Sequence, residues 1–442
     1  MKRGAKMEKT REDSGKRHFL KTVKGAVVLV TIVGMAIAIT FPMRVEAQPK
    51  PIKIAIIEPL SGALSRNGNL GLQGAKGIVK WINDQGGIKS MGGRKLQLVW
   101  ADSSSATESA ATAMERLIRD PEVVLATDGW ASSFEMSSTE VTERAQVLQF
   151  NTGFSDALST RGFKWGFYVS PPAMEQGRIG LKNVIDLARG HGQVIKTAMI
   201  VGDNQAAGRA FYDACRALLP PMGVTIISEE VYAMGTLTDA TAIVQKVKAK
   251  NPDVVMFFAS AISECQMILM KKKEMGINIP FIGNGGWACD PSFAAVGAET
   301  LEGFTTFTPC FPNKKTPQVW LDYLMAQSKA EYSDEAYPAQ ELCWPLTMYP
   351  IIATGLEQAG TLDRHKLWEV FRKMDLPPGN TVLGGLNPGA MLAGQAVAFD
   401  ETGRIAKKYQ NVVVVQWQSG RPKTIWPPDL AMASPLWKFE KK

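Results

Sequence analysis

The strongest constraint on the fold is a repeated alternation of short apolar runs with amphipathic helical stretches. The run from Ile52 to Ile57 is apolar except for Lys53, which is typical of a strand buried on both faces. A helical stripe of apolar residues follows it and ends before Gly86 and Gly87. Repetition of this unit predicts parallel sheets with helices on both faces, because a parallel connection needs a crossover, usually a helix.

The alternation starts twice, which predicts two doubly wound lobes of the α/β class. The first series of strands is expected over residues 52–57, 95–100, 123–126, 147–150 and 167–169. The second is expected over residues 198–201, 224–227, 254–258 and 280–282. A helical block at 319–330 and 342–359 must pack on one of the sheets, and strands at 396–399 and 412–417 close the fold. The chain therefore crosses between the lobes several times, and we expect crossings near 170–173, 308–312 and 399–403.

The charge of the chain does not favour a nucleic-acid partner. The formal net charge is +8, but residues 1–47 hold ten Lys and Arg and four Asp and Glu, so the rest is close to neutral. Apolar residues make up 45% and charged residues 21%, as in an ordinary globular protein. We therefore expect no nucleic-acid binding.

The basic N-terminus predicts export. Lys16, Arg17, Lys21 and Lys24 precede sixteen uncharged residues, from 26 to 41, and a small-residue cleavage pattern ends at Ala47. Sixteen residues is short for a membrane-spanning helix, which needs about 20, although a retained anchor is the alternative. Residues 15–21 resemble a twin-arginine signal with one Arg replaced by Lys, so the Tat and Sec routes both stay open.

The sequence contains no pattern of a known catalytic or metal centre. The five cysteines, at 215, 265, 289, 310 and 343, form no CxxC pair, and the three histidines form no HExxH motif. There is no GxSxG elbow, no phosphate loop and no dinucleotide fingerprint after a strand. We expect a protein that is not an enzyme and that needs no cofactor.

Several motifs, in their order and spacing, resemble one known family. They are Ile56–Gly62, Trp81–Ile88, Asp102–Ser103, Asn251–Val255, Leu301–Gly303 and Phe399–Gly403. Together they resemble the periplasmic leucine/isoleucine/valine-binding proteins, the solute receptors of branched-chain amino acid ABC transporters. The resemblance covers nearly all of the chain after residue 47.

The resemblance implies the type I periplasmic binding protein fold, with three crossover segments and a ligand held between the lobes. The implied N-terminal lobe is 48–171 with 312–396, and the C-terminal lobe is 172–311 with 397–425. Residues 426–442 would form a tail, after a cleaved signal peptide of residues 1–47. If the strands at 280–282 and 304–307 are neighbours, as the family implies, Cys289 and Cys310 are candidates for a disulfide, with separate thiols as the alternative.

The resemblance also places ligand contacts on two loops. Ser132, with its neighbour Ser133, falls where the family binds a ligand carboxylate, and a helix N-cap is a compatible role for either hydroxyl. Trp130 falls at an apolar ligand contact, with a core position as the alternative. Thr152 falls where a backbone carbonyl accepts from the ligand ammonium.

Other positions depart from the family. Phe154 stands in place of a Thr hydroxyl, Ala207 in place of an aromatic residue, and Gly285 in place of the acid that pairs with the ammonium. Glu264 is a substitute acid or an ordinary first-turn residue of a helix. Because a buried ammonium without a counter-charge costs several kcal/mol, these departures and Trp287 favour a carboxylate with an apolar or aromatic body, or an amide, over leucine, isoleucine or valine.

We therefore expect a periplasmic substrate-binding protein that delivers a small-molecule solute to an inner-membrane permease and acts as a monomer. The alternative is a sensory protein that binds solute and reports to a receptor instead of a transporter.

Overall fold

The computed structural model describes residues 49–285, 290–331, 340–379 and 387–437. The predicted signal segment, Trp287 and Cys289 lie outside the described residues. The described residues belong to the compact unit that begins at Pro49. Within the described residues, no helix has the length and apolarity that crossing a membrane requires.

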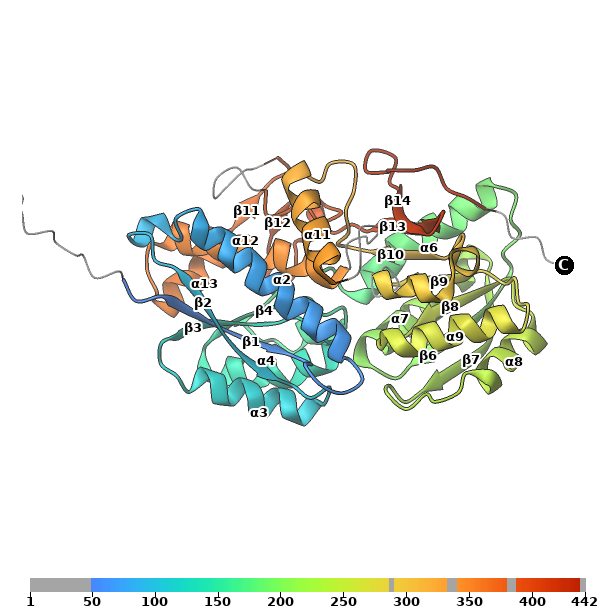
Figure 1. Cartoon of the computed structure of the whole chain (residues 1–442), viewed down its shortest axis with the longest axis horizontal. Helices are drawn as coiled ribbons and strands as arrows, with labels where there is room; N and C mark the ends of the chain where they lie inside the picture. The colour runs from blue at the N-terminus through green and yellow to red at the C-terminus, as the bar shows by residue number, and fades with distance from the viewer. Residues whose placement is uncertain (1–48, 286–289, 332–339, 380–386, 438–442) are drawn as a thin grey trace, which may run out of the picture. The chain divides into compact units, whose positions relative to one another are not determined.

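Two sheets form the framework of two lobes (Figure 1). The first sheet has the order β2 (Leu96–Asp102), β1 (Ile52–Glu58), β3 (Val123–Asp128), β4 (Leu148–Asn151), β5 (Gly166–Tyr168). The second has the order β14 (Arg421–Trp426), β13 (Val413–Gln418), β10 (Thr305–Thr308), β9 (Phe281–Asn284), β8 (Val254–Phe258), β6 (Thr197–Asp203), β7 (Thr225–Tyr232). All pairs in the first sheet are parallel, whereas β13 is antiparallel to both β10 and β14.

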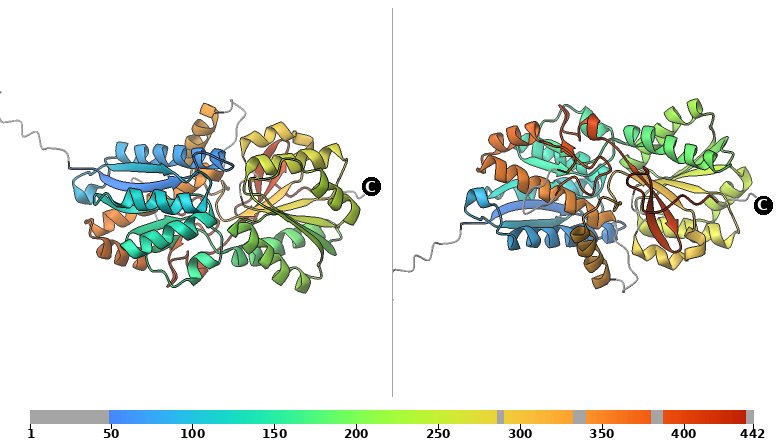
Figure 2. Two further views of the ribbon diagram at one scale, coloured as in Figure 1. Left: turned by 90° about the horizontal axis from the view of Figure 1, so that it is seen from below. Right: turned by 90° about the horizontal axis from the view of Figure 1, so that it is seen from above.

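Helices cover both faces of each sheet, as the unbroken apolar strands predict (Figure 2). In the first half of the chain they are α2 (Ser65–Asp84), α3 (Thr107–Ile118), α4 (Ser132–Ala145), α5 (Ala157–Thr160), α6 (Ala173–Gly190) and α7 (Ala206–Leu218). The others are α8 (Thr241–Lys250), α9 (Ile262–Glu274), α10 (Ala298–Leu301), α11 (Gln318–Glu331), α12 (Gln340–Ala359) and α13 (Arg364–Lys373). The alternation predicted from the sequence is thus confirmed.

The late helical block packs on the first lobe. Helix α12 lies beside α2, and the Tyr349 hydroxyl is 3.1 Å from Thr127 Oγ1 in β3. Helix α13 joins the same lobe, because Arg364 donates to the Val123 carbonyl at 2.8 Å. The first sheet is therefore covered by helices from two distant parts of the chain.

Two predictions about the C-terminal part were wrong. The strand expected at 396–399 is short, β12 (Val397–Ala398), and pairs with β11 (Asp375–Leu376) in a small sheet of its own. The third crossing comes later than 399–403, because Tyr168 bonds to the Gly403 carbonyl and to the Ile405 N–H at the edge of the first sheet. The predicted boundary between 396 and 397 is therefore too early.

The C-terminal segment is also not a free tail. Trp426 ends β14, and Leu430 is buried. Leu436 donates from its backbone N–H to Gln416 in β13 at 2.7 Å. The residues after β14 thus pack along the second sheet.

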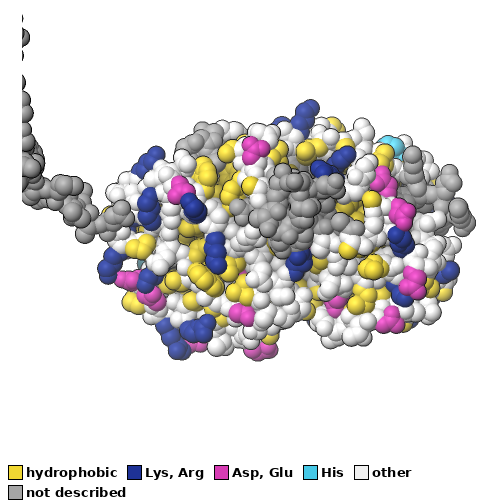
Figure 3. Space-filling view, viewed as in Figure 1, with side chains coloured by type: hydrophobic (Ala, Val, Ile, Leu, Met, Phe, Trp, Pro, Cys, Tyr) yellow, Lys and Arg dark blue, Asp and Glu magenta, His cyan; other side chains and the backbone are white. Residues whose placement is uncertain are grey.

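The surface carries charges of both signs. On the face shown in Figure 3, lysine and arginine are interspersed with aspartate and glutamate. Cys310 is buried and is a free thiol, 3.8 Å from Thr347 Oγ1. Its proposed disulfide partner, Cys289, lies outside the described residues, so that disulfide stays a prediction.

Candidate functional site

Loops from both lobes enclose a pocket where parallel strands end, the place where open α/β sheets bind ligands. We call it the cleft pocket, and its lining residues are Trp130, Ala131, Ser132, Thr152, Gly153, Phe154, Gln205, Ala207, Phe258 and Ser260. The first six follow β3 and β4 of the first sheet, and the others end or follow β6 and β8 of the second. The free space within it is about 20 Å³ in this structure, about what one water molecule needs.

Five of the seven residues predicted to bind ligand meet in this pocket: Trp130, Ser132, Thr152, Phe154 and Ala207. Ser133 does not line it, because its hydroxyl accepts from the Ala206 N–H at 3.2 Å and so joins α4 to α7. Trp287 lies outside the described residues.

The N-cap role proposed for Ser132 and Ser133 was wrong. The cap residue of α4 is Ala131, and it makes no side-chain cap bond. The buried Ser132 hydroxyl instead accepts from the Phe154 N–H at 3.0 Å and the Ser155 N–H at 3.2 Å. Both of its acceptor sites are used, so its O–H hydrogen is available to a group in the pocket.

Further donors converge on the same space. The backbone N–H groups of Ser132 and Ser133, at the start of the 14-residue helix α4, find no acceptor among the described residues. Gln205 caps α7 by accepting from the Ala207 N–H at 2.7 Å, and its buried Nε2 has no partner in the described part of the chain. A helix N-terminus with free N–H groups favours an anion such as a carboxylate.

The Glu135 carboxylate binds the loop of residues 152–155, which follows β4. The carboxylate accepts from the Thr152 N–H at 2.8 Å and the Gly153 N–H at 2.8 Å. Burial raises the pKa of Glu135 to about 7, and those hydrogen bonds and the charge of Arg404 partly oppose the shift. The four N–H groups of residues 152–155 are thus taken by Glu135 and Ser132, which fixes the loop.

Arg404 ties the same loop to the crossover segments. Its buried guanidinium donates to the carbonyls of Gly153 at 2.7 Å, Ser155 at 2.5 Å and Ser170 at 3.2 Å. It also lies 4.6 Å from the centre of the Tyr168 ring. One side chain therefore connects the loop after β4, the first crossing and the last crossing.

The walls of the cleft pocket are mainly apolar. Phe154 is 5% exposed and packs edge-on against Trp344, at 6.1 Å between ring centres. Trp130 is half-buried and packs against apolar clusters in both lobes. The described residues that line the pocket include no carboxylate.

Neither of the two positions considered for an acidic residue, Gly285 and Glu264, places a carboxylate in the cleft pocket. Gly285 is bonded within the second sheet, where its carbonyl accepts from Thr306 Oγ1 at 2.6 Å. Glu264 is in the first turn of α9 and accepts from the Leu237 N–H at 3.0 Å, without lining the pocket. The role of Glu264 as an ordinary first-turn residue is confirmed.

Sequence reasoning missed several residues of the site. The side chains of Gln205 and Ser260 gave no signal in the sequence. Glu135 reads as a surface residue of α4, and Arg404 comes one residue after the motif that ends at Gly403. Only their contacts reveal that they hold the ligand loop.

Comparisons with known proteins agree with this geometry. The family model described as periplasmic binding protein matches residues 51–422. The Leu/Ile/Val-binding protein homolog 8 of Brucella abortus (strain 2308) is 23% identical over 398 residues, which cover 88% of this chain and 93% of that protein.

Solved structures share the fold. The branched-chain amino acid transporter substrate-binding protein LivJ of Streptococcus pneumoniae, in complex with isoleucine, has a TM-score of 0.69 and 18% identity, covering 84% of this chain and 97% of that one. An ABC transporter solute-binding protein of R. palustris, in complex with benzoate, has a TM-score of 0.69 and 16% identity, covering 85% and 95%. The chain, with its two sheets and a pocket between them, therefore belongs to the periplasmic binding protein family and shares the type I fold of the solved branched-chain amino acid binding proteins.

Proposed function

We propose that this solute-binding protein is the substrate-binding component of an ABC transporter and delivers a small organic carboxylate to an inner-membrane permease. The observation that carries the proposal is the cleft pocket, where Ser132 from one lobe and Gln205 from the other present donors to one apolar space. Binding of one solute by both lobes stabilises a closed form that a permease can distinguish from the open form.

The ligand that fits this pocket has a carboxylate and an apolar or aromatic body. The Ser132 hydroxyl, the N–H groups that begin α4 and the Gln205 amide supply donors for the carboxylate. Trp130, Phe154 and Phe258 supply a wall for the body. An α-ammonium would find no carboxylate among the described lining residues, and burying it unpaired costs several kcal/mol.

The related structures bind ligands of both kinds, isoleucine in one and benzoate in another. We therefore propose direct calorimetry with benzoate and with leucine on the chain without residues 1–47. Benzoate is expected to bind more tightly than leucine, and scattering should show compaction when ligand is added. Tight leucine binding that Glu264→Ala abolishes would refute the ligand assignment.

We also propose that residues 1–47 direct export to the periplasm and are removed, and that the mature protein is monomeric. Lobe boundaries are proposed at 171 and 311, where the strand series change sheets. The N-terminal sequence of the exported protein tests the cleavage, and its sedimentation tests the monomer.

A further inference from the structure

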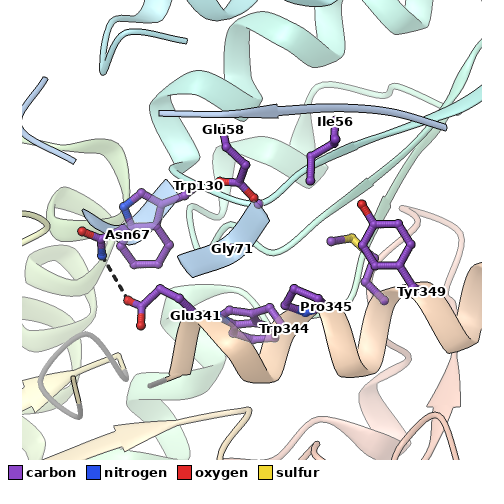
Figure 4. A pocket seen from close by; sticks show the side chains of 11 residues that line it. Ile56, Glu58, Asn67, Gly71, Trp130, Glu341, Trp344, Pro345 and Tyr349 are labelled. Atoms are coloured by element: carbon purple, nitrogen blue, oxygen red, sulfur yellow. Dashed lines mark hydrogen bonds between the residues drawn. The ribbon is translucent and has the colours of Figure 1, made fainter. Parts of the chain in front are cut away.

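A second cavity lies behind Trp130, inside the first lobe. It is enclosed by β1, α2, the loop after β3 and α12, and we call it the acidic cavity (Figure 4). The residues with polar atoms that line it include Glu58, Asn67, Trp130, Glu341 and Trp344. Its free space is about the size of one water molecule or one ammonium group. Trp130 lines this cavity and the cleft pocket alike, so the two spaces adjoin at its side chain.

The acidic cavity contains several buried polar atoms without partners. In the described part of the chain, Glu58 Oε2, Asn67 Oδ1 and Glu341 Oε2 accept no hydrogen bond, although these residues are at most 3% exposed. The indole N–H groups of Trp130 and Trp344 are also unpaired there. Native proteins leave few buried polar groups unsatisfied, so such a group of them indicates an absent occupant.

The fold makes room for the Glu58 carboxyl. Figure 4 shows Glu58 reaching from β1 toward Gly71 of α2, with Trp130 at one side. A Cβ atom added at Gly71 would come within 2.7 Å of Glu58 Oε1, and one added at Gly129 would collide with the same atom. Glycine at both positions therefore admits the carboxyl to the interior.

The charges around the cavity are acidic. Burial raises the pKa of Glu58 well above its usual value, and the charges of Asp128, Glu135 and Glu341 raise it further. Burial also raises the pKa of Glu341 to about 8, with a smaller contribution from Asp290 and an opposing one from Arg66. No lysine, arginine or histidine is among the described residues that line the cavity.

The cation that lowers the pKa of Glu341, Arg66, has another partner. The Arg66 guanidinium binds Asp290, with Nε 3.0 Å from both carboxylate oxygens and Nη2 2.9 Å from Oδ1. This pair joins α2 of the first lobe to the segment after β9 of the second. Glu341 itself is bonded to Asn67 Nδ2 at 3.0 Å, which orients it toward the cavity. The unpaired oxygens thus find no hydrogen-bond donor among the described residues.

We propose that the acidic cavity is a subsite for the protonated amine of a solute whose carboxylate is held at Ser132. A protonated amine supplies several N–H donors, compensates the carboxylates and lies favourably on indole faces. This inference rests on the proposed function, and it narrows the ligand to amino carboxylates whose amine is separated from the carboxylate by a spacer. An α-ammonium lies next to its own carboxylate and stays on the Ser132 side of Trp130.

The test compares solutes that differ only in the amine. Calorimetry is run with 4-methylbenzoate, 4-(aminomethyl)benzoate and 4-carbamoylbenzoate, and with hexanoate and 6-aminohexanoate. The amine is expected to improve affinity by about tenfold or more over its methyl partner. Because the amine displaces a proton from a buried carboxyl, binding measured in buffers of different ionisation enthalpy should release protons to the solvent.

Glu58→Gln is the decisive variant. It keeps the size and an acceptor oxygen but cannot ionise, so it should abolish both the gain from the amine and the proton release while binding of 4-methylbenzoate persists. Glu264→Gln is the matched control, because Glu264 is also 3% exposed with an unpaired Oε2 but lines neither cavity. It should leave the gain unchanged.

The outcomes separate the two proposals. If the methyl compounds bind as tightly as the amines, or if Glu58→Gln keeps the amine gain, the subsite is refuted and the carboxylate receptor stands. Preference for the amide without proton release also refutes the amine subsite. If no carboxylate binds, with or without an amine, the proposed ligand class fails itself. Thermal melting of each variant shows whether it is folded.

Discussion

Ser132→Ala is the substitution that most directly tests how the cleft pocket is held together. The Ser132 hydroxyl is buried and accepts from two backbone N–H groups, those of Phe154 and Ser155. Alanine leaves both without a partner in a place that water does not reach. A buried unsatisfied donor costs about 1–3 kcal/mol, so for the two donors together we expect a local loss of about 2–6 kcal/mol.

The magnitude distinguishes this role from simple helix capping. Loss of an N-cap side chain costs about 1 kcal/mol. Ser133→Ala is the control on the neighbouring residue, because the half-buried Ser133 hydroxyl accepts from one N–H, that of Ala206 at 3.2 Å. It should cost about 1 kcal/mol or less.

Hydrogen exchange is the appropriate assay, because a two-lobed protein need not unfold in one step. In Ser132→Ala, exchange at the amides of Phe154 and Ser155 should be faster by about thirtyfold, which corresponds to about 2 kcal/mol. Ser133→Ala should leave these two amides unchanged. Equal effects of the two substitutions on this loop would refute the reasoning.

Three further predictions concern the carboxyls and the loop. Because the pKa of Glu341 is raised to about 8 from 4.5, the contribution of this group to stability is greatest below pH 4.5 and falls as the pH rises toward 8. Glu341→Gln should remove this loss, at most about 5 kcal/mol, in melts across that range, and an unchanged pH dependence would contradict the assignment. Lysine cannot reach all the carbonyls that Arg404 bonds, so Arg404→Lys should lower the stability of this loop by about 1–3 kcal/mol and speed amide exchange in residues 152–155. Exchange as slow as in the wild type would contradict this role of Arg404. Gln205→Glu keeps the side-chain oxygen that accepts from the Ala207 N–H and caps α7, but it places a carboxylate at the proposed anion site. The affinity for benzoate should therefore fall by about tenfold or more in calorimetry. Equal affinity would exclude Gln205 from that site.

The order of strands and helices was predictable from the sequence because it depends on local periodicity. Strand β8 (Val254–Phe258) is apolar throughout and the run Ile52–Ile57 is apolar except for Lys53, and the structure packs both between helix layers. The family was predictable for a related reason, since its motifs are short segments at the ends of these elements. Five predicted residues also meet in the cleft pocket, because the loops after parallel strands gather at one edge of a sheet.

Local patterns gave the wrong partner wherever the partner is distant. Ser132 reads as an N-cap, but its hydrogen bonds go to residues 22 and 23 positions later. The third crossing was placed too early because Gly403 to Ile405 pair with Tyr168, which no periodicity reveals. Arg404 acquires its role through partners 251 and 249 positions away.

The acidic cavity depends on the tertiary structure alone. Glu58 ends a strand, Asn67 lies on the next helix, and Glu341 begins a helix 274 positions after Asn67. In the sequence each is an ordinary polar residue of a strand end or first helical turn. Packing of α12 against α2 brings these three side chains together and removes them from water. Because they are removed from water, their oxygens are left without hydrogen bonds and prefer a cation.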